Sequence, residues 1–459
     1  MLAALTLLTL LPVLPAVDDL PRSAITDREL DKFAKDVQAF FKAMDEDDRK
    51  DKAEAIDSIR SAMEKAGKRA KISDILVHPG DWEYLLEAAK PVDRAIKAKL
   101  GKGFFAYSFV DQWDGSATAC LLSVPKNYGK TDGYHPAIVG LVPPIGKSGK
   151  ELIAEVTAQA TATYGPLMES AIILIPLGPD SGSRSPNPAE LGESWATDEG
   201  LAVMFTCMRV LLERMQFDRA SVLLDGWGEA GIDAFRVVTG YPSWFAGVIN
   251  RGGEVGGDEM LLENLTGVSV LYVAAEGEGQ DVDTEALKER LSEYSDLTVV
   301  AHEGAATAPS AEALDSIATW ASNRRRDLAP KTIHFKLGDI RFQSVNWLKA
   351  MVIDRRANAR PGDKDFPRID AKVDPATNRI VIEAVNVTEL EVYLSDALVD
   401  LDKPVAIEVN GTEMVKKTFT RSLQTMLENR YYNNSGDLGL YPVKYLVEGI
   451  AKNVPGKSL

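Results

Sequence analysis

Cysteine and histidine are scarce in this chain of 459 residues, which contains two cysteines and four histidines. None of them has the spacing of metal ligands, so we expect no metal centre, and we expect no other cofactor. Cys120 and Cys207 lie in apolar runs, where buried free thiols are common. A disulfide between them remains the alternative in an oxidising compartment.

Basic residues are fewer than acidic residues. The chain has 52 Lys and Arg against 68 Asp and Glu, a formal net charge of −16. No basic stripe with interleaved aromatic residues offsets this charge. Because such a surface repels a phosphate backbone, we expect no nucleic-acid partner.

Long apolar runs are absent apart from the first sixteen residues. That run is too short to cross a bilayer comfortably and ends in small residues, so it predicts a signal peptide over residues 1–17. An uncleaved anchor is the alternative, because the usual basic segment is missing. We expect an exported bacterial protein, periplasmic or extracellular, with no stable membrane insertion once the signal is removed.

Helices are predicted throughout residues 18–100. The apolar residues on the first helical face are Phe33, Val37, Phe40, Phe41 and Met44. An acidic run at 45–48 interrupts this pattern, and a second amphipathic helix follows up to residue 66. A third, short helix is predicted at 82–89. A helical region of this kind more often packs or docks than catalyses.

Strands alternate with helices over residues 101–330. The strands are predicted at 104–110, 116–124, 136–142, 171–176, 221–224, 245–250, 268–274 and 297–301. The helices are predicted at 150–162, 198–216, 230–239, 284–293 and 310–323. Such alternation predicts a mostly parallel sheet with helices on both faces. We interpret Arg324, Arg325 and Arg326 as the solvated cationic end of the last helix.

Strands dominate from residue 331 to the end of the chain. They are predicted at 332–337, 347–353, 367–372, 378–384, 388–394, 404–409 and 442–448, with turns such as Asn410-Gly411 between them. We therefore expect a separate, mainly antiparallel β-domain over residues 331–459.

The segment 221–231 carries the strongest local signal. It is an apolar strand followed by closely spaced small residues and then a helix, which permits the sharp, strained turn of a nucleophile elbow. The residues of the turn are Gly226, Trp227, Gly228, Glu229 and Ala230. The carboxyl ends of the strands should carry the site.

Several segments around this turn resemble one family. They are Phe217-Asp218-Arg219-Ala220, the run 240–248, Val124-Pro-Lys-Asn-Tyr128, and Trp195 with Asp198-Glu199-Gly200. Over residues 103–330 the chain resembles the exported bacterial esterase and polyhydroxybutyrate-depolymerase-like (dienelactone-hydrolase-like) branch of α/β hydrolases. The run 398–411 is similar to a tail appended to some members. The resemblance implies an α/β-hydrolase fold between the helical segment and the β-domain.

The catalytic positions depart from the family pattern. Laid on Gly-x-Ser-x-Gly, Gly228 takes the place of the serine and has no side chain to attack a carbonyl. The base should be a histidine in the loop after strand 297–301, where Ala306 or Thr307 stands. Pro143-Pro144 replaces a His-Gly-Gly-like oxyanion turn and lacks N–H donors. We expect that the serine-hydrolase mechanism is lost.

Displaced groups provide an alternative chemistry. Glu229, Asp281 and His302 are the weak candidates for an ester or peptide hydrolase of another kind. Trp227 is a candidate to fill the former substrate pocket.

Carboxylates also gather at the predicted strand ends. They are Asp225, Glu229, Glu254, Asp258, Glu276, Glu278, Asp281 and Glu303. One hypothesis is an acidic binding pocket for a cation, a basic peptide or a sugar, with Arg184 or Arg251 as counter-charge. The alternative is that acids near helix N-termini only complement the helix dipole.

The expected function is therefore a non-catalytic binding or scaffold protein descended from an exported esterase. Its partner is an unknown small molecule, polymer or protein. If the β-domain instead supplies the binding surface, we expect an exposed aromatic or apolar patch on residues 331–459.

Overall fold

The computed structural model describes most of the chain. The described residues are 20–71, 74–90, 93–110, 117–129, 134–143, 145–179, 194–255, 261–276, 283–338, 343–354, 360, 362–432 and 440–450. The predicted signal segment lies outside them, as do Pro144, Arg184, Asp258, Glu278 and Asp281. Within the described ranges, no helix is both long enough and apolar enough to cross a membrane.

The N-terminal part consists of helices, as the apolar spacing predicts. Their bounds are α1 (Asp27–Leu30), α2 (Ala34–Asp45), α3 (Arg49–Ala70), η1 (Ile75–Val77), α4 (Pro79–Ala88) and α5 (Arg94–Lys97). The acidic break between α2 and α3 has a structural reason. Asp48 caps α3, and its carboxylate accepts hydrogen bonds from the N–H groups of Lys50 and Asp51.

The central part is an eight-stranded sheet in the order β1-β2-β4-β3-β5-β6-β7-β8. Its strands are β1 (Phe105–Val110), β2 (Ala117–Ser123), β3 (Ala137–Leu141), β4 (Ile172–Pro179), β5 (Val222–Trp227), β6 (Gly247–Arg251), β7 (Ser269–Glu276) and β8 (Leu297–Glu303). β2 is antiparallel to both its neighbours, and the pairs from β4 to β8 are parallel. This is the sheet of the α/β-hydrolase fold, which confirms the predicted class.

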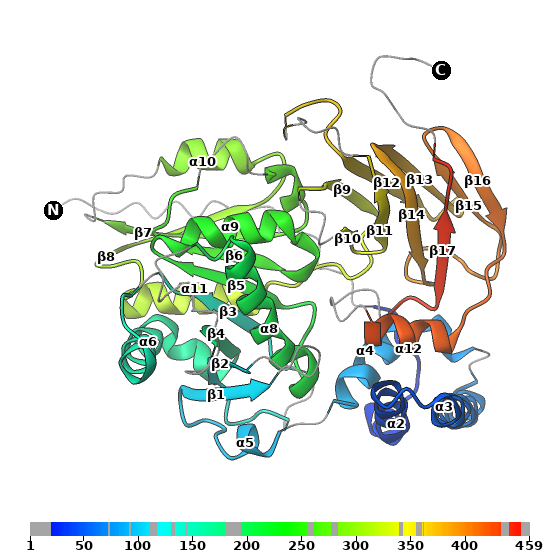
Figure 1. Cartoon of the computed structure of the whole chain (residues 1–459), viewed down its shortest axis with the longest axis horizontal. Coiled ribbons are helices and arrows are strands. Elements are labelled where there is room, and N and C mark those ends of the chain that lie inside the picture. The colour runs from blue at the N-terminus through cyan, green and yellow to red at the C-terminus, as the bar shows by residue number, and fades with distance from the viewer. Residues whose placement is uncertain are drawn as a thin grey trace.

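Helices cover both faces of this sheet (Figure 1). They are α6 (Gly149–Tyr164), η2 (Gly165–Glu169), α8 (Asp198–Arg214), α9 (Ala230–Gly240), η3 (Pro242–Trp244), η4 (Leu262–Leu265), α10 (Thr284–Leu291) and α11 (Ala311–Ser322). On one face the ring of Phe205 in α8 contacts Tyr241, which follows α9. On the other face α6 contacts the loop that precedes α11, where Thr163 donates a hydrogen bond to the carbonyl O of Thr307.

The C-terminal part contains two further sheets, of four and five strands, in the orders β10-β11-β14-β17 and β16-β15-β13-β12-β9. Their strands are β9 (Thr332–Lys336), β10 (Ser344–Val345), β11 (Leu348–Ile353), β12 (Arg368–Asp374), β13 (Arg379–Val385), β14 (Val387–Leu394), β15 (Val405–Val409), β16 (Thr412–Lys417) and β17 (Val443–Val447). All pairs are antiparallel except β13 with β15. The two sheets share one apolar core.

One helix, α12 (Leu423–Tyr432), leaves this β region. Its apolar residues Leu423, Met426 and Leu427 join the core of the N-terminal helices. Figure 1 shows α12 beside α2 and α3, below the β-sheets. The C-terminal part is therefore packed on the N-terminal helices through α12.

Candidate functional site

The elbow turn is present between β5 and α9. Gly228 follows the last residue of β5 with a φ of 51°, and α9 begins at Ala230. The N–H of Gly228 donates to the carbonyl O of Arg251 over 2.8 Å, and the N–H of Gly231 donates to the carbonyl O of Gly228 over 2.9 Å. These two bonds hold the turn against the end of β6.

Small residues are required around the turn. A Cβ atom on Gly226 would overlap the carbonyl O of Ala230, and one on Gly231 would overlap the side-chain amide of Asn250. Gly228 differs, because a Cβ there would meet nothing within 4 Å. Gly228 thus has the position and the open space of an elbow nucleophile, without the side chain.

A cavity of about 350 Å³, here called the elbow cavity, opens above this turn. Its lining residues are Gly228, Glu229, Arg251, Gly252, Tyr272, Ala275, Ala306 and Thr307. The structure therefore brings the serine-replacing position and the two base-replacing positions to one cavity. Gly228 and Ala306 carry no nucleophilic or titratable side chain, and none of the three residues is a histidine.

The displaced candidates do not all reach this cavity. Glu229 lines it and is exposed. His302 is buried on β8 with Nδ1 2.9 Å from the carbonyl O of Glu303, and it is not among the residues that line the cavity. Asp281 lies outside the described residues. Of the two candidates that the structure describes, Glu229 lines the elbow cavity and His302 does not.

A buried polar network lies beneath the cavity. The guanidinium of Arg251 donates to both oxygens of Asp225, at 2.8–3.0 Å, and both side chains are fully buried. Trp227 Nε1 donates to the hydroxyl of Tyr164 over 3.2 Å, and the Tyr164 hydroxyl also bonds Asp225. Burial raises the pKa of Tyr164 well above its usual value, so the phenol remains a donor.

This network corrects two predictions. Asp225 does not offer its carboxylate to a ligand, because Arg251 neutralises it in the core. Trp227 does not fill the cavity. Its indole ring packs on Tyr164, with 5.7 Å between centroids, because it projects from the same face of β5 as Asp225.

The other predicted acids do not converge on the elbow cavity within the described chain. Glu254 and Glu303 are exposed and are not among its lining residues, and Glu276 ends β7. Glu278 and Asp258 lie outside the described residues. Glu229 precedes the first residue of α9, whereas Glu254, Glu276 and Glu303 lie outside the first turn of the helices that follow them, so neither the acidic pocket nor the dipole interpretation accounts for these three.

The segment around Trp195 braces the same edge of the sheet. Its indole Nε1 donates to the carbonyl O of Val142 over 2.7 Å, and its N–H donates to the carboxylate of Asp233 on α9 over 2.7 Å. Ser194 also bonds Asp233. This region, quoted for the family resemblance, thus ties the loop before Pro143 to the elbow helix.

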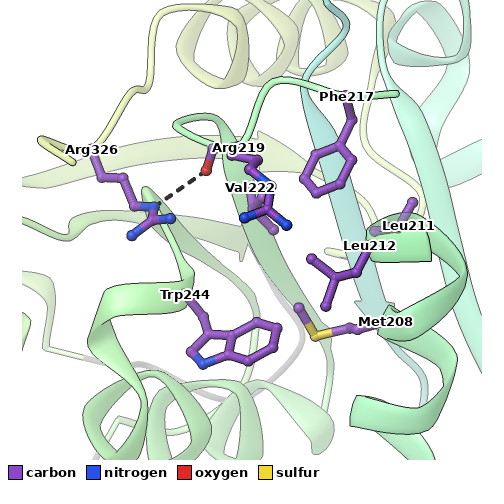
Figure 2. A pocket seen from close by; sticks show the side chains of 8 residues that line it. All are labelled: Met208, Leu211, Leu212, Phe217, Arg219, Val222, Trp244 and Arg326. Atoms are coloured by element: carbon purple, nitrogen blue, oxygen red, sulfur yellow. Dashed lines mark hydrogen bonds between the residues drawn. The ribbon is translucent and has the colours of Figure 1, made fainter. Parts of the chain in front are cut away.

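The cationic triplet is not a solvated helix end. Figure 2 shows the buried Arg326 donating to the carbonyl O of Arg219 beside a second cavity. Arg325 pairs with Asp218, and Arg324 lies over the ring of Trp320. The prediction was wrong for Arg326, because α11 ends at Ser322 and the chain then turns inward, whereas Arg325 is exposed. The cavity in Figure 2, of about 10 Å³, has room for about one water molecule and no ligand.

The described part of the chain gives no support for metal binding or for catalysis by a thiol. No group of three or more potential metal ligands converges there. Cys120 and Cys207 are both buried and free. Burial raises the pKa of both thiols, which makes them poor nucleophiles.

Exposed apolar side chains gather in the C-terminal part. Met351 and Val352 on β11 and Leu446 on β17 are 38%, 42% and 41% exposed, and Tyr432 on α12 is 66% exposed. The first three belong to one sheet. The patch expected for residues 331–459 stays a prediction.

Comparisons with known proteins add the following similarities. No protein-family model matches the chain, and no curated protein matches it either. Among solved structures the chain is similar to a thermostable esterase, with 19% sequence identity and a TM-score of 0.37. The match covers 49% of this chain and 64% of the esterase, so this chain spans less than two thirds of the esterase's length. It is also similar to the BES protein from Bacillus cereus, with 15% identity and a TM-score of 0.32 over 48% of this chain and 96% of that one. An S-formylglutathione hydrolase from Agrobacterium tumefaciens has 12% identity and a TM-score of 0.34 over 48% of this chain and 94% of that one.

Proposed function

We propose that this chain is a non-catalytic descendant of an exported esterase and binds a small molecule in the elbow cavity. One observation carries the proposal. Gly228 and the pair Ala306 and Thr307, which the sequence resemblance aligns with the serine and the histidine of the hydrolases, line the same cavity. Acyl transfer needs a nucleophile within hydrogen-bond reach of a base, and the described residues that line the cavity include no serine, cysteine or histidine.

The remaining polar groups around the elbow cavity favour ligand binding rather than catalysis. Arg251 is held by Asp225. Burial raises the pKa of Tyr272, which keeps its phenol neutral. Glu229 at the exposed mouth and the hydroxyl of Thr307 remain to orient a ligand. A volume of about 350 Å³ suits a small organic molecule.

A single probe separates binding from turnover. In saturation-transfer NMR, p-nitrophenyl butyrate is expected to bind the wild-type chain as the intact ester, with no release of p-nitrophenol above buffer. Thr307→Trp, which places a large ring in the cavity, should abolish the transfer signal. Thr161→Trp, at an exposed position on α6, should not.

Two results would overturn the proposal. Release of p-nitrophenol by the wild type that Glu229→Gln abolishes would establish a displaced catalytic group. An equal transfer signal from wild type and Thr307→Trp would show that the elbow cavity is not the binding site.

A further inference from the structure

A larger pocket lies where the three parts of the chain meet. This junction pocket has a volume of about 730 Å³, within the range of small-molecule sites. Its walls come from α2, the end of α4, the C-terminal end of α8 and the end of α12. Its lining residues are Lys35, Gln38, Ala39, Phe41, Lys42, Asp45, Leu86, Ala89, Lys90, Leu212, Glu213, Arg214, Arg430 and Tyr431. It shares no residue with the elbow cavity.

The charge of the junction pocket is opposite to that of the chain. Acidic residues outnumber basic ones in the whole sequence, 68 to 52. Around the pocket, Lys35, Lys42, Lys90, Arg214 and Arg430 face only Asp45 and Glu213 among its lining residues. Excess positive charge in a concave site focuses the field and attracts anions.

The floor of the pocket contains an incompletely bonded cation. Arg430 is 6% exposed, and its Nη2 lies 3.4 Å from Glu87 Oε1. Its Nη1 has no hydrogen-bond partner within the described structure. Lys90 lies beside it, bonded to Glu87 over 2.5 Å, and burial lowers the pKa of this ammonium to about 7. A buried guanidinium nitrogen without a partner costs free energy that an anion would recover.

Aromatic and aliphatic side chains form the walls. The rings of Phe41 on α2 and Tyr431 on α12 stack with 6.5 Å between centroids and 18° between planes. The Tyr431 hydroxyl donates to Asp45 over 2.9 Å, which fixes its ring. Leu86 and Leu212 add apolar surface at the base. These side chains offer the apolar body of a ligand a surface to pack on.

We propose that the junction pocket binds a small organic anion with an aromatic body, its acid group directed at Arg430. The excess of basic residues favours an anionic ligand, and Arg430 Nη1 offers a hydrogen-bond donor to its acid group. The rings of Phe41 and Tyr431 provide an apolar surface for its aromatic body. The ligand then contacts the N-terminal helices, the hydrolase-fold core and α12 at once.

The test compares two fluorescent probes with similar rings. 1-Anilinonaphthalene-8-sulfonate carries the anion, and N-phenyl-1-naphthylamine lacks it. The full-length chain is expected to bind the sulfonate roughly tenfold more tightly or better, the value of about one charge-assisted hydrogen bond. Equal affinities would overturn the assignment of an anionic ligand.

Variants locate the site. Arg430→Gln is expected to remove the preference for the sulfonate. Ala39→Trp, on the exposed surface of α2, should block both probes while leaving the fold intact by circular dichroism. The matched control Ala53→Trp on α3 lies at an exposed position outside the pocket lining. Sulfonate binding unchanged in Ala39→Trp would show that the probe binds elsewhere and would overturn the proposal.

Discussion

At Gly228 the backbone is held at a φ of 51°, a conformation that costs a residue with a side chain about 1 kcal/mol or more. A catalytic serine bears that strain for the sake of reactivity. Glycine adopts the conformation without strain, so the turn is retained and the cost is removed. A glycine at this position is therefore less strained than a serine would be.

Glu83 on α4 gives a residue-scale prediction about pH. Burial raises the pKa of its carboxyl from 4.5 to about 7. The negative charges of Asp218 and Glu87 also raise this pKa, and the positive charges of Arg325 and Arg219 lower it in part. Between these two pH values the folded state binds more protons than the unfolded state. The contribution of Glu83 to stability is therefore lost as pH rises through this window.

Glu83→Gln should remove that loss. The variant is expected to match wild type near pH 4.5 and to exceed its free energy of unfolding by about 1 to 2 kcal/mol at pH 8, after allowance for partial exposure. Urea denaturation at both pH values measures this, with the exposed Glu64→Gln on α3 as control. A variant less stable than wild type at pH 8 would contradict the argument.

At the scale of elements, the elbow helix depends on close packing at its first turn. Gly231→Ala would push a methyl group into the Asn250 side chain, and we expect a loss of about 1 to 3 kcal/mol. Gly240→Ala, at the other end of α9, meets nothing within 4 Å and should be neutral or stabilising. Thermal denaturation of the two variants provides the comparison, and equal effects would show that the packing is not limiting.

The sequence predicts nearly every element of the central sheet, because its strands are buried apolar runs separated by amphipathic helices. It also places Gly228 and Thr307 at one site, through the resemblance. It does not predict β16 or α12. For α12 a signal was available, since Leu423, Met426, Leu427 and Arg430 have helical spacing, but the surrounding strands obscured it.

The contacts that side chains make with distant segments of the chain could not be predicted from the sequence. Asp225 and Trp227 stand beside the elbow in the chain, yet alternation along β5 directs both into the core. Arg326 follows a helix end but turns inward to the carbonyl groups of Arg219 and Ser243. Such outcomes depend on contacts between segments distant in sequence.

At the scale of the whole molecule, Glu87 connects the three parts. Its carboxylate accepts hydrogen bonds from Lys90, from Arg219 of the hydrolase-fold core over 2.7 Å, and from Arg430 of α12 over 3.4 Å. All four side chains are buried. One carboxylate thus holds the N-terminal helices to both other parts.

Glu87→Gln should leave these cations without their shared counter-charge. We expect the free energy of unfolding to fall by about 3 to 5 kcal/mol, as for a broken buried ion pair. Denaturant titration measures it, with Glu46→Gln in the exposed Lys42 pair as control. A loss below about 1 kcal/mol would mean that packing alone joins the parts.

The most direct test of the central claim is hydrolysis of p-nitrophenyl butyrate by the wild-type chain beside Gly228→Ser, Glu229→Gln and His302→Ala. Loss of both nucleophile and base predicts no turnover above buffer for the wild type, and none for Gly228→Ser, which still lacks the base. Wild-type turnover abolished by Glu229→Gln or His302→Ala would contradict the account and assign the chemistry to a displaced group.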